Sequence, residues 1–226
     1  MLQHNSRPEV GRFLQCTLPL FPRTTVNDHP LGLVFDMDGT LVDSGLDFQL
    51  IRREMGIADR QPILEAIQQM SPGEADRCRE ILARHERAGA ERATLMPGVT
   101  DFLAEVRRRG WPAAVLTRNT RPLTLLTLDR LGLHFDPIIT RDDAPAKPDP
   151  TAIEQICAAW RLPPERIVVI GDFLFDVQVA HRAAARAVLF TAGRDPQGLP
   201  GADEADFLLE SFQMSDELFR WLAELA

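Results

Sequence analysis

Two aspartates, Asp36 and Asp38, directly follow a short apolar run of this 226-residue chain. A carboxylate can attack phosphorus and form an acyl-phosphate, which water then cleaves. A second carboxylate two residues further on can protonate the leaving oxygen and later activate the water. Gly39 permits the tight turn that would aim both side chains at one point. The spacing predicts phosphoryl-transfer chemistry, although Asp and Gly are also common in solvated turns.

Three further polar segments follow apolar runs, namely Thr117-Arg118-Asn119, Lys147-Pro148, and Gly171-Asp172 with Asp176 four residues on. Taken singly, they fit a strand end, a surface loop and a helix N-cap. Lys147 is the only lysine among 25 basic residues, which favours a specific role for it. Because clustered carboxylates repel one another unless a cation joins them, the set predicts a Mg²⁺ site. Lysine and metal would together offset the charge of a transferring phosphoryl group.

Short apolar runs and amphipathic stretches alternate along the chain. The runs are typical of buried strands, and they lie at 31–35, 113–116, 137–139, 167–170, 187–190 and 207–209. Helical periodicity occurs at 100–109, 122–131, 153–160 and 215–225. This alternation predicts an α/β fold with a doubly wound parallel sheet. Ligands of such sheets bind at the carboxyl ends of the strands, where the polar segments above would meet.

Residues 45–96 interrupt the alternation. They contain three amphipathic stretches and a capping box at Ser71–Glu74, so we expect them to be all helical. The predicted organisation is therefore a core of 31–44 and 97–226 with a small helical domain inserted after the first strand. Residues 1–30 show no period that fits the core and are predicted to be an N-terminal extension.

Composition excludes several classes of partner. The net charge of −8 argues against nucleic acid or an anionic membrane surface as a main partner. No apolar run approaches the ~20 residues of a membrane span. The three cysteines form no motif, and the first thirty residues lack a continuous apolar signal region. We therefore expect a cytoplasmic protein, and the sequence leaves its oligomeric state open.

The segment Asp36-Met37-Asp38-Gly39-Thr40-Leu41-Val42-Asp43-Ser44 closely resembles the first motif of the haloacid dehalogenase-like (HAD) superfamily. The other three polar segments resemble the remaining motifs of that superfamily, in its phosphoglycolate-phosphatase-like branch. The resemblance extends over about 31–226 and implies a Rossmann-like core. It also implies that the helical insert is a mobile cap that closes over a small phosphate ester.

The resemblance also implies a role for each motif residue. Asp36 would be the nucleophile and Asp38 the acid/base, with its main-chain carbonyl facing the metal. Thr117 and Asn119, with Arg118 between them, would contact the substrate phosphoryl group. Lys147 would orient Asp36. The Mg²⁺ ligands would be Asp36, Asp38 and Asp172, with Asp176 in support.

Other activities of the same superfamily can be weighed from the residues. Dehalogenases lack an aspartate at the position of Asp38, and phosphonatases need a lysine in the cap, where this chain has none. A phosphosugar mutase stays open because its core motifs are similar. A catalytically dead regulatory or binding module is the alternative from another class, although the nucleophile, acid/base, lysine and metal aspartate are all present.

The substrate itself is not readable from the sequence. Arg52 and Arg53 are candidates for an anionic group of the substrate, because the first insert helix follows the catalytic loop directly. Further candidates are Arg84, His85 and Arg87, although most such side chains lie on solvated helix faces. One departure from the family pattern is Phe173, where many relatives have serine; Phe175 follows it, and this apolar turn is expected to pack against the cap.

Overall fold

The computed structural model describes residues 30–226. The predicted N-terminal extension, apart from Pro30, lies outside this range. Within it, no helix combines the length and the apolar character needed to cross a membrane.

A six-stranded parallel sheet forms the centre of the core. In sequence order its strands are β1 (Gly32–Phe35), β4 (Ala113–Leu116), β5 (Ile138–Ile139), β6 (Ile167–Gly171), β7 (Arg186–Phe190) and β8 (Phe207–Leu209). Their spatial order is β5-β4-β1-β6-β7-β8, and every neighbouring pair is parallel. The first strand, β1, lies near the middle of the sheet, and the later strands are added on both sides of it. The doubly wound α/β prediction is therefore confirmed.

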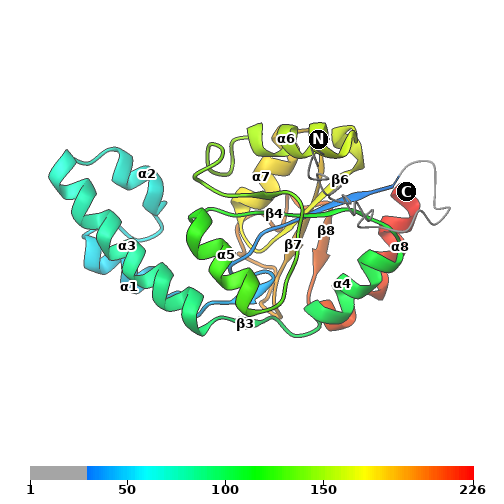
Figure 1. The fold of residues 1–226 in the computed structure, drawn as a ribbon, viewed down its shortest axis with the longest axis horizontal. Helices are drawn as coiled ribbons and strands as arrows, with labels where there is room; N and C mark the ends of the chain where they lie inside the picture. Colours follow the sequence, from blue (N-terminus) through cyan, green and yellow to red (C-terminus); the bar gives the residue numbers. More distant parts are fainter. Residues whose placement is uncertain (1–29) are drawn as a thin grey trace, which may run out of the picture.

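Helices cover both faces of the sheet (Figure 1). On one face lie α4 (Val99–Arg108), α5 (Arg121–Arg130) and α8 (Asp216–Leu225), and on the other α6 (Thr151–Trp160) and α7 (Leu174–Arg182). Successive strand residues point to opposite faces, so Leu33 and Phe35 pack in the first layer and Val34 in the second. Two short 3-10 turns, η1 (Pro164–Arg166) and η2 (Phe212–Met214), complete the core.

Three helices form a separate bundle beside the sheet, at the left of Figure 1. They are α1 (Phe48–Met55), α2 (Ile63–Gln68) and α3 (Pro72–Arg92). The bundle has its own apolar cluster, in which Ile51, Ile67 and Leu82 are buried. At the start of α3 the main-chain N–H of Ser71 donates to Glu74 Oε2 at 3.3 Å, as expected for a capping box. We call residues 45–96 the helical insert.

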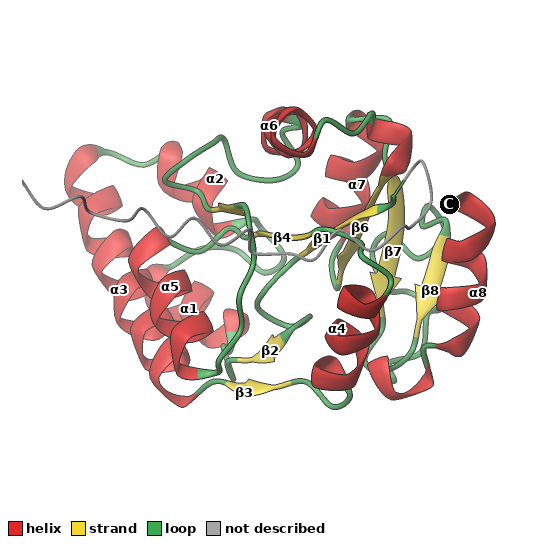
Figure 2. Cartoon of the chain, turned by 45° about the vertical axis from the view of Figure 1, so that its right-hand side comes forward, coloured by secondary structure: helices red, strands yellow, loops and turns green. Residues whose placement is uncertain are grey.

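The insert is not helical throughout, so the all-helical prediction for 45–96 is wrong at its end. A second, two-stranded sheet pairs β2 (Val42–Asp43) with β3 (Thr94–Leu95) in antiparallel register (Figure 2). Strands of two residues are too short to produce a detectable alternation of apolar and polar side chains. The partner opposite Leu95 is Val42, fifty-three positions earlier in the chain, and a local pattern cannot reveal such pairing.

Candidate active site

The carboxyl edge of the sheet gathers residues from four loops. Asp36 follows β1, Thr117 follows β4, and Asp172 follows β6. The first two remain tied to the sheet by their main chain: Asp36 N donates to Ile170 O at 2.9 Å and Thr117 N to Ile139 O at 3.0 Å. Lys147 comes from the loop between β5 and α6. The backbone of rigid strands thus fixes where these side chains begin.

Lys147 lies at the centre of a buried charge cluster. Its Nζ donates to Asp36 Oδ1 at 2.5 Å and to Asp176 Oδ1 at 2.6 Å. The side chains of Lys147, Asp36 and Asp176 are only 3%, 10% and 4% exposed. Carboxylate oxygens of Asp36, Asp172 and Asp176 all lie within 4.8 Å of one another. The lysine that is unique in the sequence is therefore in direct contact with the predicted nucleophile.

Burial and charge act in opposite directions on this cluster. Burial lowers the pKa of Lys147, but the charges of Asp176 and Asp36 outweigh it, so the pKa is raised and the ammonium form is favoured. The pKa of Asp36 is also raised: burial raises it, Lys147 lowers it, and Asp176 and Asp172 raise it further. Three carboxylates here face one ammonium, so negative charge is in excess.

Two further motif aspartates, Asp172 and Asp38, also hold protons more tightly than usual. Burial raises the pKa of Asp172 to about 6, with Asp176 adding to the effect and Arg194, 3.3 Å away, opposing it. Burial likewise raises the pKa of Asp38, against the lowering effect of hydrogen bonds from Ser44 and Asn119. Asp38 is thus a carboxyl group that keeps its proton to higher pH than an ordinary aspartate.

Two glycines make the close approach of these carboxylates possible. Gly39 has φ of +86°, and a Cβ at this position would lie 2.7 Å from Asp172 Oδ2. A Cβ on Gly171 would lie 2.1 Å from Asp176 Cγ. Any larger residue would have to displace a carboxylate of the cluster, so both positions require glycine.

Asn119 connects the loop after β4 to the loop after β1. Its main-chain N–H donates to Thr117 Oγ1 at 3.1 Å, and its Nδ2 donates to Asp38 Oδ2 at 3.2 Å. Its Oδ1 accepts a hydrogen bond from Thr120 N at 2.8 Å, which fixes the amide orientation. Thr117 and Asn119 are both buried, so the loop presents a rigid polar surface beside Asp38.

The chemistry of the donor set fits a hard divalent cation. Carboxylate oxygens are the ligands that Mg²⁺ prefers, and a divalent charge would offset the negative charge that Lys147 and Arg194 leave on the three carboxylates. Asp36 and Asp172 are suited to bind such a cation directly. In Asp176, Oδ1 accepts from Lys147 and Oδ2 accepts from Phe173 N at 3.2 Å, so both oxygens already have partners.

Predicted residues of the insert lie away from this cluster. Arg52 donates to the carbonyl oxygens of Gln61 and Phe48, both in the insert, and Arg53 is exposed on the same helix. Arg84 and His85 both contact Glu54, again within the insert. The predicted contact between the apolar turn and the insert takes another form: Phe175 stacks under Arg118, which in turn reaches α2.

Three contacts near the site were not predicted: the pair of Arg118 with Glu65, the pair of Arg141 with Glu86, and the contact of Arg194 with Asp172. The partners that the motifs do not contain are Glu65, Glu86, Arg141 and Arg194, and neither arginine nor glutamate is rare enough in this chain to single one out. A hollow of about 810 Å³ between α4 and α8 contains none of the catalytic candidates, so a large volume does not by itself mark the site.

Comparison with known proteins gives consistent results. The family model of haloacid dehalogenase-like hydrolases matches residues 31–184. A haloacid dehalogenase-like hydrolase domain-containing protein of Arabidopsis thaliana is 30% identical over 194 residues, which cover 80% of this chain and 77% of that protein. Phosphoglycolate phosphatase 1 of Pseudomonas aeruginosa is 30% identical over 208 residues, which cover 80% and 76%.

Solved structures share the fold. A haloacid dehalogenase-like family hydrolase of Streptococcus pneumoniae superposes with a TM-score of 0.67 at 23% identity, covering 85% of this chain and 98% of that one. A predicted phosphoglycolate phosphatase of Haemophilus somnus gives 0.66 at 20% identity with the same coverage. With the family model and the curated relatives, these findings show that the chain belongs to the haloacid dehalogenase-like hydrolase family, in its phosphoglycolate-phosphatase-like branch.

Proposed function

We propose that the chain is a Mg²⁺-dependent phosphatase that hydrolyses a small phosphorylated metabolite through an aspartyl-phosphate on Asp36. Its class, phosphoric monoester hydrolase, follows from the family and its branch. The cation, the covalent intermediate, the residue roles and the substrate are the proposal. The observation that carries it is the buried contact of Lys147 with Asp36, beside the carboxylates of Asp172 and Asp176.

In the first half-reaction a carboxylate oxygen of Asp36 forms a bond to phosphorus as the bond to the leaving oxygen breaks. Lys147 holds Asp36 in place through Oδ1, and its ammonium offsets the charge that builds up on the phosphoryl oxygens. The proton of Asp38 passes to the leaving oxygen, which departs as an alcohol. The raised pKa of Asp38 supports this role, because the group keeps a proton available.

In the second half-reaction Asp38, now a carboxylate, takes a proton from water as that water attacks phosphorus. The bond between Asp36 and phosphorus breaks, phosphate leaves, and both aspartates return to their starting forms. The hydrogen bond from Asn119 Nδ2 holds Asp38 in position for both steps. Thr117 and Asn119 contact the phosphoryl group, with Arg118 at the rim.

Asp36, Asp172 and the main-chain carbonyl of Asp38 would hold Mg²⁺, which would reduce the repulsion between the phosphate and the carboxylates. Asp176 supports the site from the next layer, since its oxygens accept from Lys147 and Phe173 N. In this proposal residues 45–96 are the cap of a core formed by 31–44 and 97–226. The cytoplasmic location stays a prediction.

Phosphate release from an aryl phosphate and from a panel of small phosphate esters, with Mg²⁺ and with EDTA, tests the proposal. We expect turnover that chelation abolishes and added Mg²⁺ restores. Asp36→Asn should abolish turnover while the fold is kept, because an amide is nearly isosteric with a carboxylate but cannot attack phosphorus. A matched control is Asp203→Asn, which removes an exposed carboxylate in the loop after β7.

The proposal is falsified if Asp36→Asn keeps turnover within about tenfold of the parent, since a lost nucleophile should cost far more. Turnover that survives full chelation would overturn the metal role alone. Isomerisation of a phosphosugar without release of phosphate would favour the mutase alternative.

A further inference from the structure

Arg118 leaves the catalytic loop and crosses to the helical insert. Its Nη2 donates to both carboxylate oxygens of Glu65 in α2, at 2.8 and 2.7 Å. Its Nη1 donates to the main-chain carbonyl of Lys147. Because this nitrogen contacts the main chain of Lys147 and Arg118 lies between Thr117 and Asn119 in the chain, we place the guanidinium at the rim of the proposed phosphoryl site.

An aromatic ring lies against this guanidinium. The Cζ atom of Arg118 lies 4.5 Å from the ring centroid of Phe175, the residue before Asp176. The ring of Phe175 in turn packs edge-on against Phe173, at 5.1 Å between centroids. A guanidinium that lies over a ring and is anchored through Nη1 keeps Nη2 directed at a carboxylate, here at both oxygens of Glu65. Arg118 and Phe175 thus form a built subsite for an anion.

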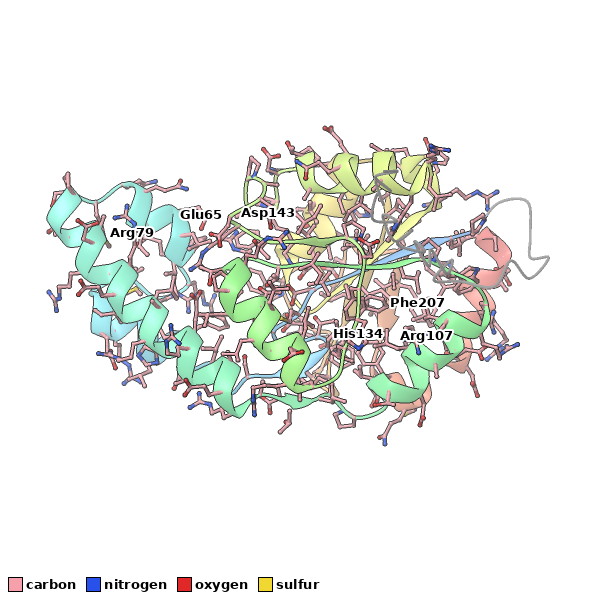
Figure 3. The ribbon with its side chains drawn as sticks, viewed as in Figure 1. Glu65, Arg79, Arg107, His134, Asp143 and Phe207 are labelled. Atoms are coloured by element: carbon pink, nitrogen blue, oxygen red, sulfur yellow. The ribbon has the colours of Figure 1, made fainter. Side chains whose placement is uncertain are left out.

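The occupant of this subsite is a side chain of the protein itself. Figure 3 shows Glu65 where α2 approaches the core. Its side chain is 40% exposed and that of Arg118 is 20% exposed, so solvent and small solutes can reach the pair. An ion pair this open to water contributes little to stability and can exchange partners.

A second arginine of the core, Arg141, also pairs with a carboxylate of the insert. Arg141 donates from Nη1 and Nη2 to Glu86 in α3, at 2.6 and 2.9 Å, and from Nη1 to the carbonyl oxygen of Arg118. The insert therefore supplies a carboxylate to each of these two core cations. A second anion on the substrate would meet occupied guanidinium groups and two carboxylates, Glu65 and Glu86.

We propose that Glu65 fills an anion subsite formed by Arg118 and Phe175, so that the enzyme prefers phosphate monoesters whose leaving group is uncharged. This inference rests on the proposed function. A carboxylate on the leaving group has to displace Glu65 from Arg118, which leaves two carboxylates competing for one guanidinium. Relatives of this chain are named phosphoglycolate phosphatases, and phosphoglycolate carries such a carboxylate. We therefore expect Glu65 to disfavour phosphoglycolate as a substrate of this chain.

Two esters of similar size test the preference. 2-Hydroxyethyl phosphate has a neutral leaving group, and 2-phosphoglycolate carries a carboxylate at the same position. We expect the parent to have the higher kcat/KM for 2-hydroxyethyl phosphate at fixed Mg²⁺ and ionic strength. Glu65→Gln should shift the ratio toward 2-phosphoglycolate by about two- to fivefold, the size of an exposed ion pair.

Two further variants identify the cause of the shift. Glu54→Gln removes a carboxylate that pairs with Arg84 inside the insert, and it should leave the ratio unchanged. Adding Arg118→Gln to Glu65→Gln should cancel the gain for 2-phosphoglycolate, because the subsite is then lost. Melting curves confirm that each variant is folded.

Hydrolysis of an aryl phosphate by the parent provides the reference for the proposed function. If that ester is hydrolysed but Glu65→Gln changes all rates equally, the pair only joins the insert to the core and the inference is overturned. A parent that already prefers 2-phosphoglycolate overturns it too. If the aryl phosphate is not hydrolysed, the proposed function fails and the inference fails with it.

Discussion

The buried cluster at the sheet edge and the boundary with the insert use the same kind of contact under different conditions. Lys147 meets two carboxylates where almost no water reaches, whereas Arg118 meets Glu65 in contact with solvent. In the first region an unpaired charge would be costly, so the partners are fixed. In the second, water can replace either partner. The degree of burial therefore determines whether an ion pair keeps fixed partners or can exchange them.

The pair of Arg141 with Glu86 lies between these extremes. Glu86 is 7% exposed and Arg141 is 18% exposed. Burial raises the pKa of Glu86, hydrogen bonds and charge from Arg141 lower it, and Asp38 raises it further. A buried carboxylate of the insert is therefore coupled electrostatically to the predicted acid/base residue.

The largest expected effect comes from Lys147. Lys147→Met removes the ammonium but keeps much of the volume, and we expect turnover to fall by roughly 10²- to 10³-fold, as for a lost charge-stabilising donor. Lys147→Arg should also lose activity, because a planar guanidinium is too large for a site that holds an ammonium between Asp36 and Asp176. Steady-state kinetics on an aryl phosphate measures both. Near-parental rates for Lys147→Met would mean that the buried ion pairs of Lys147 matter no more for turnover than the exposed pair of Arg118 with Glu65.

A stability measurement sharpens the comparison. Arg141→Gln leaves the buried Glu86 without its cation and should cost about 1–3 kcal/mol of unfolding free energy. Arg118→Gln breaks a more exposed pair and should cost at most about 1 kcal/mol. Urea unfolding at pH 7 determines both values. Equal losses would mean that exposure does not govern the strength of these pairs.

The smallest effect is a dependence of stability on pH in the metal-free protein. The pKa of Asp172 is raised from 3.8 to about 6 in the folded state, so folding binds its proton more tightly. The stabilisation is fully present below pH 3.8 and is lost as the pH rises through about 6. Melting temperature should therefore fall between these pH values.

Asp172→Asn should flatten that slope, while the exposed-site control Asp203→Asn should keep it. Added Mg²⁺ should raise the melting temperature of the parent more at pH 8 than at pH 5, because the cation binds deprotonated carboxylates. A slope that Asp172→Asn leaves unchanged would assign the dependence to other groups.

The sequence predicted the sheet and the cluster for a common reason. Asp36 and Asp172 directly follow short buried strands, and parallel strands bring such positions to one edge. Lys147 was identifiable because lysine occurs only once. The contacts between the insert and the core depend on tertiary geometry. Glu65 and Arg118 are fifty-three positions apart in the chain, and no local pattern marks Glu65 as the partner of Arg118.

The β2–β3 pair has a consequence for how the chain tolerates its insert. Val42 faces Leu95 and Asp43 faces Thr94, so the insert leaves and re-enters the core at adjacent points. Arg92 strengthens the junction by donating from Nε to Ser44 O at 3.0 Å and from Nη2 to Gly45 O. An Asn-Gly turn joining Asp43 directly to Thr94 would close the same ladder as a tight hairpin. Because the two ends of the insert are adjacent, we expect this junction to accept segments of very different length without displacing the strands of the main sheet.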